Sequence, residues 1–139
     1  MVTRTLRQRH GDAGEAVAAA YLAGLGWRIV GRQVPVGRDE VDVVAVDPGP
    51  PATLVVVEVR TRTGDQFGPP EASVDRAKLT RCYRAAGALR RARALPDGTR
   101  LPSLPWRVDV VAVELGAGTD ASHPVRGPRV RHLRAVLMP

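Results

Sequence analysis

Two strongly apolar segments that lie close together in the chain, residues 37–46 and 54–60, most constrain how it can fold. Each contains four valines, and residues 47–52 between them contain three prolines with one Asp and one Gly, so the segments predict the two strands of one hairpin. Buried strands rarely carry carboxylates, because burying an unpaired charge is costly. Here Asp42 begins one strand and Glu58 lies near the end of the other. In an antiparallel hairpin these positions lie side by side, so the sequence predicts an acidic corner.

An acidic corner of this kind requires a cation or must take up protons, because carboxylates a few ångströms apart repel each other. Carboxylate oxygens suit hard divalent cations, so we expect Mg²⁺ or Mn²⁺. Asp42 and Glu58 would be direct ligands, with the backbone carbonyl of Val59 as a third. Arg60 shares a strand face with Glu58, where its charge would stabilise a phosphate group. The alternative is that Arg60 forms an ion pair with Asp42 or Glu58 and no metal binds.

Residues 12–25 have the periodicity of an amphipathic helix. The stripe that should face the sheet contains Glu15, Ala18, Ala19, Leu22 and Leu25. A glutamate in the first turn is favoured by the helix dipole, but the dipole does not explain its place on the apolar stripe. We therefore expect Glu15 to join the acidic corner, where it would hold a water molecule or a second ion.

The remaining segments predict a second helix and three more strands. The expected ranges are residues 71–94 for the helix and 27–34, 106–115 and 130–137 for the strands. The inner face of the second helix is predicted to contain Asp75, Leu79, Cys82, Ala86 and Leu89. The order α-β-β-β-α-β-β predicts an α/β fold with a central mixed sheet flanked by helices. The loop at residues 61–70 would offer Arg62 and Gln66 to a ligand, and Lys78 near the helix start would add a further cation.

The length of 139 residues predicts a single domain at residues 11–139, preceded by a flexible basic tail at residues 1–10. The formal net charge of +7 favours a polyanionic partner, with nucleic acid preferred over a membrane surface. A bias in base composition would exchange lysine for arginine without adding net charge. The lone Cys82 excludes a disulfide framework and a thiolate metal cluster. With no apolar run near the ~20 residues of a spanning helix, and no secretory signal, we expect a soluble cytoplasmic protein.

The spacing of Glu15, Asp42 and Glu58-Val59-Arg60 resembles the PD-(D/E)XK nuclease superfamily, whose core order is α-β-β-β-α-β. A closer resemblance, to the YraN-like or UPF0102 family, covers about Arg7 to Val136. The matching motifs are Gly14-Glu15-Ala16 with Tyr21-Leu22, Gly26-Trp27, Glu40-Val41-Asp42-Val43-Val44-Ala45, Val57-Glu58-Val59-Arg60-Thr61-Arg62, Phe67-Gly68-Pro69-Pro70-Glu71-Ala72, Lys78, Val108-Asp109-Val110-Val111-Ala112 and His132-Leu133-Arg134-Ala135.

This resemblance implies a restriction endonuclease-like fold and a metal-dependent endonuclease that acts on DNA. The Glu–Asp–Glu arrangement is similar to that of archaeal Holliday junction resolvases, which implies branched DNA as the substrate. Two positions depart from the family pattern. Asp39 replaces a usual glycine, and Arg60 replaces the usual lysine, so this side chain stays protonated and cannot act as a base. Lys78 is the only lysine in the chain, which suggests a displaced catalytic lysine or a phosphate contact.

Two other interpretations remain open at the sequence level. One is a non-catalytic nucleic-acid-binding module on a nuclease scaffold, which would bind DNA in a salt-sensitive way without metal or cleavage. The other is a structural protein whose edge strand, near Val130–Leu137, pairs with a second copy of the chain. A homodimer is also compatible with the nuclease, since two active sites could cut two strands.

Overall fold

The structure, a computed structural model, describes residues 5–63, 75–116 and 127–138. Its elements are α1 (Leu6–Gly24), β1 (Arg28–Val36), β2 (Asp39–Asp47), β3 (Thr53–Thr63), α2 (Arg76–Ala92), β4 (Trp106–Leu115) and β5 (Arg129–Leu133). The strands form one sheet in the order β1-β2-β3-β4-β5. β3 and β4 are parallel and the other neighbouring strands are antiparallel. The prediction of an α/β fold with a mixed central sheet is confirmed, and the arrangement is consistent with a restriction endonuclease-like fold.

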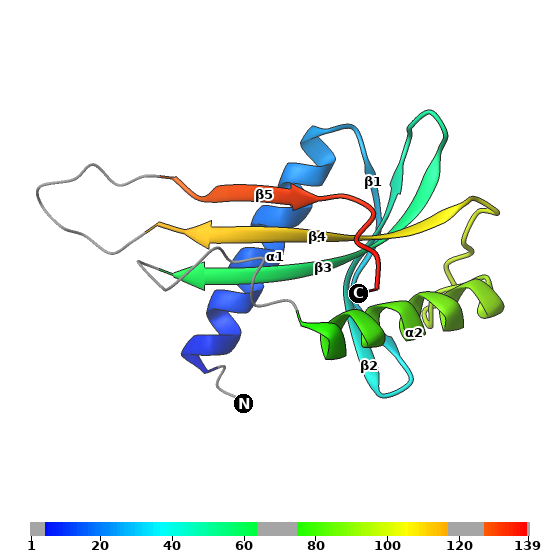
Figure 1. Cartoon of the computed structure of the whole chain (residues 1–139), viewed down its shortest axis with the longest axis horizontal. Coiled ribbons are helices and arrows are strands. Elements are labelled where there is room, and N and C mark those ends of the chain that lie inside the picture. The colour runs from blue at the N-terminus through cyan, green and yellow to red at the C-terminus, as the bar shows by residue number, and fades with distance from the viewer. Residues whose placement is uncertain (1–4, 64–74, 117–126, 139) are drawn as a thin grey trace, which may run out of the picture.

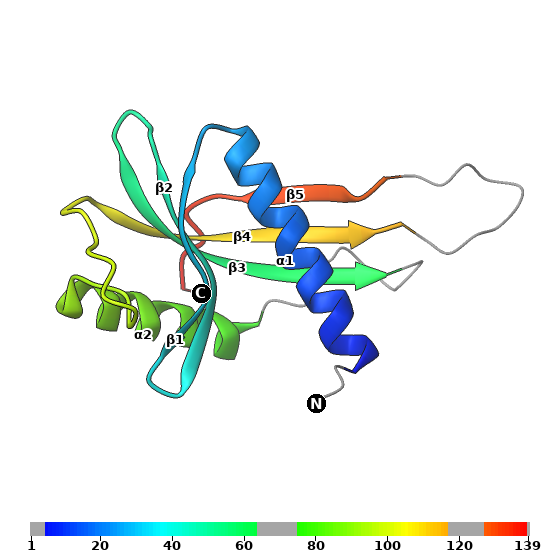
Figure 2. The same cartoon turned by 180° about the vertical axis from the view of Figure 1, so that it is seen from behind.

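The two helices cover opposite faces of the sheet, as Figures 1 and 2 show from the two sides. Alternate residues of β3 separate the two cores, because successive side chains of a strand point to opposite faces. Leu54 and Val56 pack in the core beneath α2, whereas Val55 and Val57 pack in the core beneath α1. The valine-rich strands are therefore buried on both sides, which is why they lack the usual alternation of apolar and polar residues.

The register of the central hairpin brings the two predicted carboxylates together. Val43 pairs with Val57 across the antiparallel strands β2 and β3. Asp42 is one residue before the first member of this pair, and Glu58 is one residue after the second. The predicted hairpin is thus confirmed, with both carboxylates at the same end of its paired region.

A close contact between α1 and β3 sets the position of the helix. A Cβ atom on Gly14 would lie only 1.9 Å from Oγ1 of Thr61, so the contact tolerates no side chain at this position. Gly14 precedes Glu15, and Ala18 and Leu22 on the same helix are fully buried. The glycine therefore lets α1 approach the sheet closely enough for the carboxylate of Glu15 to reach its edge.

The start of α1 differs from the prediction. The helix begins at Leu6 and not at Asp12, so residues 6–10 belong to the helix and were wrongly assigned to a tail. Thr5 and Gln8 form a capping box, in which each side chain accepts a hydrogen bond from the other's backbone N–H. Leu25 was also predicted wrongly, since it is the C-cap and its side chain is 42% exposed.

Other boundaries shift for local reasons. Asp75 is exposed and caps α2 by accepting a hydrogen bond from the backbone N–H of Lys78, so it does not lie on the inner face as predicted. Arg62 lies in β3, opposite Glu114 of β4, and not in a loop. The last strand ends at Leu133, where the backbone N–H of Ala135 turns toward Asp109.

Neither helix in the described ranges is long and apolar enough to cross a membrane.

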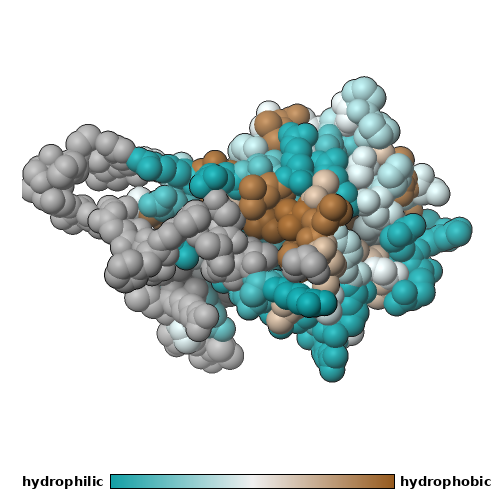
Figure 3. Space-filling view, viewed as in Figure 1, coloured by the Kyte–Doolittle hydropathy of each residue, from teal (hydrophilic) through white to brown (hydrophobic). Residues whose placement is uncertain are grey.

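Figure 3 shows the face that carries α2, where an apolar area near the centre is bordered by hydrophilic side chains. The most exposed large apolar side chains are those of Leu137, at 78%, and Leu25, at 42%.

Candidate functional site

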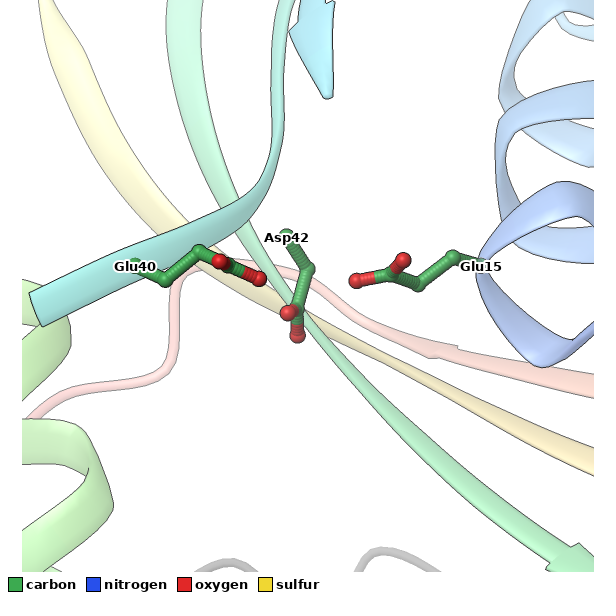
Figure 4. A group of neighbouring side chains, drawn as sticks. All are labelled: Glu15, Glu40 and Asp42. Carbon is green, nitrogen blue, oxygen red and sulfur yellow. The ribbon is translucent and has the colours of Figure 1, made fainter. Parts of the chain in front are cut away.

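Asp42 lies at the centre of a group of carboxylates contributed by two elements (Figure 4). Glu15 points toward it from α1, and Glu40 lies two residues away on β2. Each of these three side chains offers an oxygen within 4.8 Å of the other two. Glu15 is buried, Asp42 half-buried and Glu40 exposed, so the group extends from the edge of the core to the surface.

Asp42 is also linked to the middle of β3. The backbone N–H of Val59 donates a hydrogen bond of 2.8 Å to Oδ2 of Asp42. The neighbouring carboxylate of Glu58 adds a repulsive charge and a side-chain hydrogen bond. Cys82 on α2 donates a long contact of 3.8 Å from its thiol to Oε2 of Glu58. The predicted acidic corner of Glu15, Asp42 and Glu58 is therefore assembled from α1, β2 and β3.

Burial and mutual repulsion alter the protonation of this corner. Burial, together with the neighbouring Asp42, raises the pKa of Glu15 to about 7, while the hydrogen bond from Gln33 acts in the opposite direction. Burial and, after it, the charge of Glu58 raise the pKa of Asp42 to about 7. The hydrogen bond from the Val59 N–H acts in the opposite direction. Carboxyls in this state gain most from a nearby cation, because it would stabilise their charged forms.

A cavity of about 240 Å³ opens on the α2 side of Asp42. Its lining residues are Arg38, Asp39, Glu40, Val41, Asp42, Val56, Val57, Glu58, Lys78, Arg81 and Cys82. The carboxylates and the cations thus share one depression. Such a distribution suits a divalent cation at the acidic end together with a phosphate group at the basic side chains.

The basic residues predicted from the sequence take up different positions. Nη1 of Arg60 is 3.8 Å from Oε1 of Glu58, a long ion pair in which the two side chains are 25% and 16% exposed. Lys78 is half-buried and lines the cavity with Asp42 and Glu58. Burial lowers the pKa of Lys78, and the charge of Arg60 lowers it further while Glu58 opposes the change. Gln66 lies outside the described residues.

Asp39, which departs from the family pattern, is neutralised by a residue far away in the sequence. Nε and Nη2 of Arg84 each donate a 2.8 Å hydrogen bond to its carboxylate. This pairing lowers the pKa of Asp39. The negative charge of Asp39 is therefore compensated by Arg84 of α2 and adds little repulsion to the carboxylates around Asp42.

Sequence reasoning did not place Glu40 and Gln33 in the site. Glu40 shares a strand face with Asp42, and this spacing of two residues was the available signal. Nε2 of Gln33 donates a 2.7 Å hydrogen bond to Oε2 of Glu15 and a 3.1 Å bond to Oδ1 of Asp12. No pattern in the sequence indicated these bonds, because they join β1 to the helix across the edge of the sheet.

A second polar network holds the edge strand β5 in place. The fully buried carboxylate of Asp109 accepts hydrogen bonds from Nε of Arg107 at 2.9 Å and from the N–H of Ala135 at 2.9 Å. Nε2 of His132 lies 2.8 Å from its other oxygen. Burial opposes ionisation of Asp109, but the bonds from His132 and Arg107 outweigh it and lower the pKa. These groups satisfy one another, which is typical of a structural network.

A family model and individual related proteins indicate the same family for this chain. The model of the uncharacterised protein family UPF0102 matches residues 14–113, which include Glu15, Asp42 and Glu58. A UPF0102 protein of Roseiflexus castenholzii is 41% identical over 110 residues, 79% of this chain and 82% of that protein. One of an Arthrobacter species is 42% identical over 127 residues, covering 91% and 93% of the two chains. This chain therefore belongs to the UPF0102 family.

Proposed function

We propose that the protein is a divalent-metal-dependent endonuclease that acts on DNA in the cytoplasm, with branched DNA as its substrate class. The main support is the position of Asp42, between the buried carboxyl of Glu15 and a cavity that Lys78 and Arg81 also line, together with the raised pKa of both Glu15 and Asp42. Hard oxygen ligands next to cationic side chains are the combination that metal-assisted phosphodiester hydrolysis requires. The net charge of +7 favours a nucleic-acid substrate.

The carboxylates fit Mg²⁺ or Mn²⁺ by their chemistry and spacing. Asp42 and Glu58 would hold the ion with the backbone carbonyl of Val59, and Glu15 would hold a bound water molecule or a second ion. Glu40 is a further candidate ligand, because its carboxylate reaches the same group. When bound, such an ion activates water and neutralises charge on the phosphodiester. The hydrogen bond from the Val59 N–H orients one oxygen of Asp42, which leaves the other for the ion.

The cationic side chains have separate roles in this proposal. Arg60 remains protonated and stabilises negative charge on the phosphate, but cannot remove a proton from water. Lys78 offers an ammonium group that lines the cavity, where it would bind a phosphate oxygen or transfer a proton. Arg38 and Arg81 line the cavity and would contact neighbouring phosphates, with Arg62 of β3 and Gln66 as further contacts.

The first test is calorimetric titration of Mn²⁺ into the purified protein, without DNA and then with a four-way DNA junction. We expect binding that disappears in the Asp42→Asn/Glu58→Gln double variant. Asp39→Asn is the matched control, because this carboxylate lines the same cavity but is held by Arg84. The control should bind Mn²⁺ as the unaltered protein does. Absence of binding under both conditions would exclude a metal-dependent nuclease.

A second candidate function is metal-independent binding of nucleic acid. The ion pair between Arg60 and Glu58 favours it, because a carboxylate with a cationic partner needs a metal less. This module would bind DNA with a steep salt dependence and would be indifferent to Asp42→Asn. Filter binding at several salt concentrations, with and without Mn²⁺, separates the two functions. A homodimer, with paired sites or paired β5 edges, is compatible with either and would be seen by analytical ultracentrifugation.

A further inference from the structure

Gln33 has an unusual backbone conformation at the strand position that faces the candidate metal site. Its φ angle is +49°, in the left-handed region where the Cβ of most residues is crowded by the backbone. Arg32 pairs with Val43 and Val34 pairs with Val41 across β1 and β2. Gln33 lies between these two pairs and is therefore opposite Asp42. A residue without a glycine's freedom holds this conformation only where its surroundings stabilise it.

The side-chain contacts of Gln33 indicate what stabilises the conformation. Its amide nitrogen donates hydrogen bonds to two carboxylates of α1, at 2.7 Å to Glu15 and at 3.1 Å to Asp12. Both acceptors lie on one face of the helix, since they are three residues apart. Glu15 is only 7% exposed, and its carboxyl also forms a hydrogen bond with that of Asp42. One oxygen of Glu15 is thus held by an amide while the group lies beside Asp42.

We infer that Gln33 is a positioning residue for the metal site: its left-handed backbone turns the amide toward α1, and the amide fixes the rotamer of Glu15 beside Asp42. This inference rests on the proposed metal-dependent function. A glutamate side chain has several rotatable bonds, so an unrestrained Glu15 would lose conformational freedom when an ion binds. A preoriented carboxylate has less to lose, so the amide would increase metal affinity without itself being a ligand.

Two substitutions separate the hydrogen bond from the backbone conformation. Gln33→Gly removes the amide and also relieves the left-handed backbone, whereas Gln33→Ala removes the amide alone. We expect Mn²⁺ affinity to fall by about tenfold in both variants, as is typical for residues that orient metal ligands. The melting temperature of the metal-free protein should rise by about 2–5 °C in Gln33→Gly and not in Gln33→Ala. A Gln33→Gly variant that is more stable but binds Mn²⁺ more weakly would show that Gln33 serves the metal site and not the stability of the fold.

Arg93→Gly provides the matched control. Arg93 has a φ angle of +56° at the C-cap of α2, so glycine relieves the same backbone conformation far along the chain from Gln33. This variant should gain melting temperature and keep its Mn²⁺ affinity. If the unaltered protein binds no Mn²⁺, with or without DNA, the proposed function fails. If it binds Mn²⁺ and both Gln33 variants bind equally well, the positioning role is wrong. If Arg93→Gly weakens Mn²⁺ binding as much as the Gln33 variants do, the positioning role is also wrong, because any change at a left-handed residue would then lower the affinity.

Discussion

The backbone N–H of Val59 donates a 2.8 Å hydrogen bond to Oδ2 of Asp42, and so joins the middle of β3 to the first half of β2 through a side chain. Within the described hairpin, the regular pairing of these two strands ends at Val43 and Val57. The carboxylate of Asp42 takes over as acceptor at that point. A group that was predicted as a metal ligand is therefore also part of the sheet's hydrogen bonding, which holds it in a defined orientation.

The metal-free protein should lose stability as the pH rises from about 5 to about 8. The pKa of both Glu15 and Asp42 is raised to about 7 by burial, above the values near 4 of an unfolded chain. Between these values the folded state binds more protons than the unfolded state, so a rise in pH favours unfolding. We expect a loss of about 1–3 kcal/mol in the free energy of unfolding, measured by urea denaturation in EDTA.

The Glu15→Gln/Asp42→Asn double variant tests whether these two carboxyls are responsible for the effect. Its stability should be nearly independent of pH between about 5 and 8, since neither neutral side chain titrates. A double variant that declines as steeply as the unaltered protein would show that other groups are responsible.

Gly14→Ala should destabilise the protein strongly. The new Cβ would lie 1.9 Å from Oγ1 and 2.8 Å from Cβ of Thr61, so α1 must move away from β3. We expect a loss of about 1–3 kcal/mol or more, measured by urea denaturation, with weaker Mn²⁺ binding because Glu15 moves with the helix. Gly11→Ala on the same helix is the control: nothing lies within 4 Å of its added Cβ, and alanine favours a helix, so this variant should be at least as stable.

Lys78→Ala should reduce cleavage of a DNA junction by about a hundredfold if Lys78 transfers a proton, a typical effect of losing a general acid or base. Lys78→Arg keeps the positive charge, so it should restore DNA affinity but not the rate. Single-turnover cleavage and binding in Ca²⁺ would measure the two properties separately. Full activity of Lys78→Ala would show that Lys78 transfers no proton, and that Arg60 and the metal are sufficient for cleavage.

Asp109→Ala should destabilise the fold by about 3–5 kcal/mol, because it removes the fully buried carboxylate that His132 contacts and one of the two carboxylates that pair with Arg107, which keeps only Asp47. Urea denaturation at pH 7 measures the loss. Since the network holds β5 and lies apart from the residues around Asp42, the variant should keep its Mn²⁺ affinity under conditions where it remains folded. Loss of Mn²⁺ binding in the folded variant would instead connect this network to the site.

Local patterns in the sequence were sufficient for the hairpin, its register and much of the acidic corner. Strand periodicity and a loop rich in Gly and Pro place Asp42 opposite Glu58, since the period of two and the turn together determine which side chains are neighbours. Helical periodicity placed Glu15 on the buried face of α1 for the same kind of reason. The start of that helix was not recovered, because the capping box of Thr5 with Gln8 lies in a basic stretch without an apolar stripe.

Contacts between distant segments were decided only by the tertiary structure. Gln33 reaches Glu15 from 18 residues away, Arg84 neutralises Asp39 from 45 residues away, and Lys78 enters the cavity because α2 packs over β2 and β3. The left-handed conformation of Gln33 likewise depends on its partners on α1, because glutamine has no intrinsic preference for it. Periodicity therefore determines which face a residue occupies, whereas the packing of whole elements determines which charges meet and how their protonation changes.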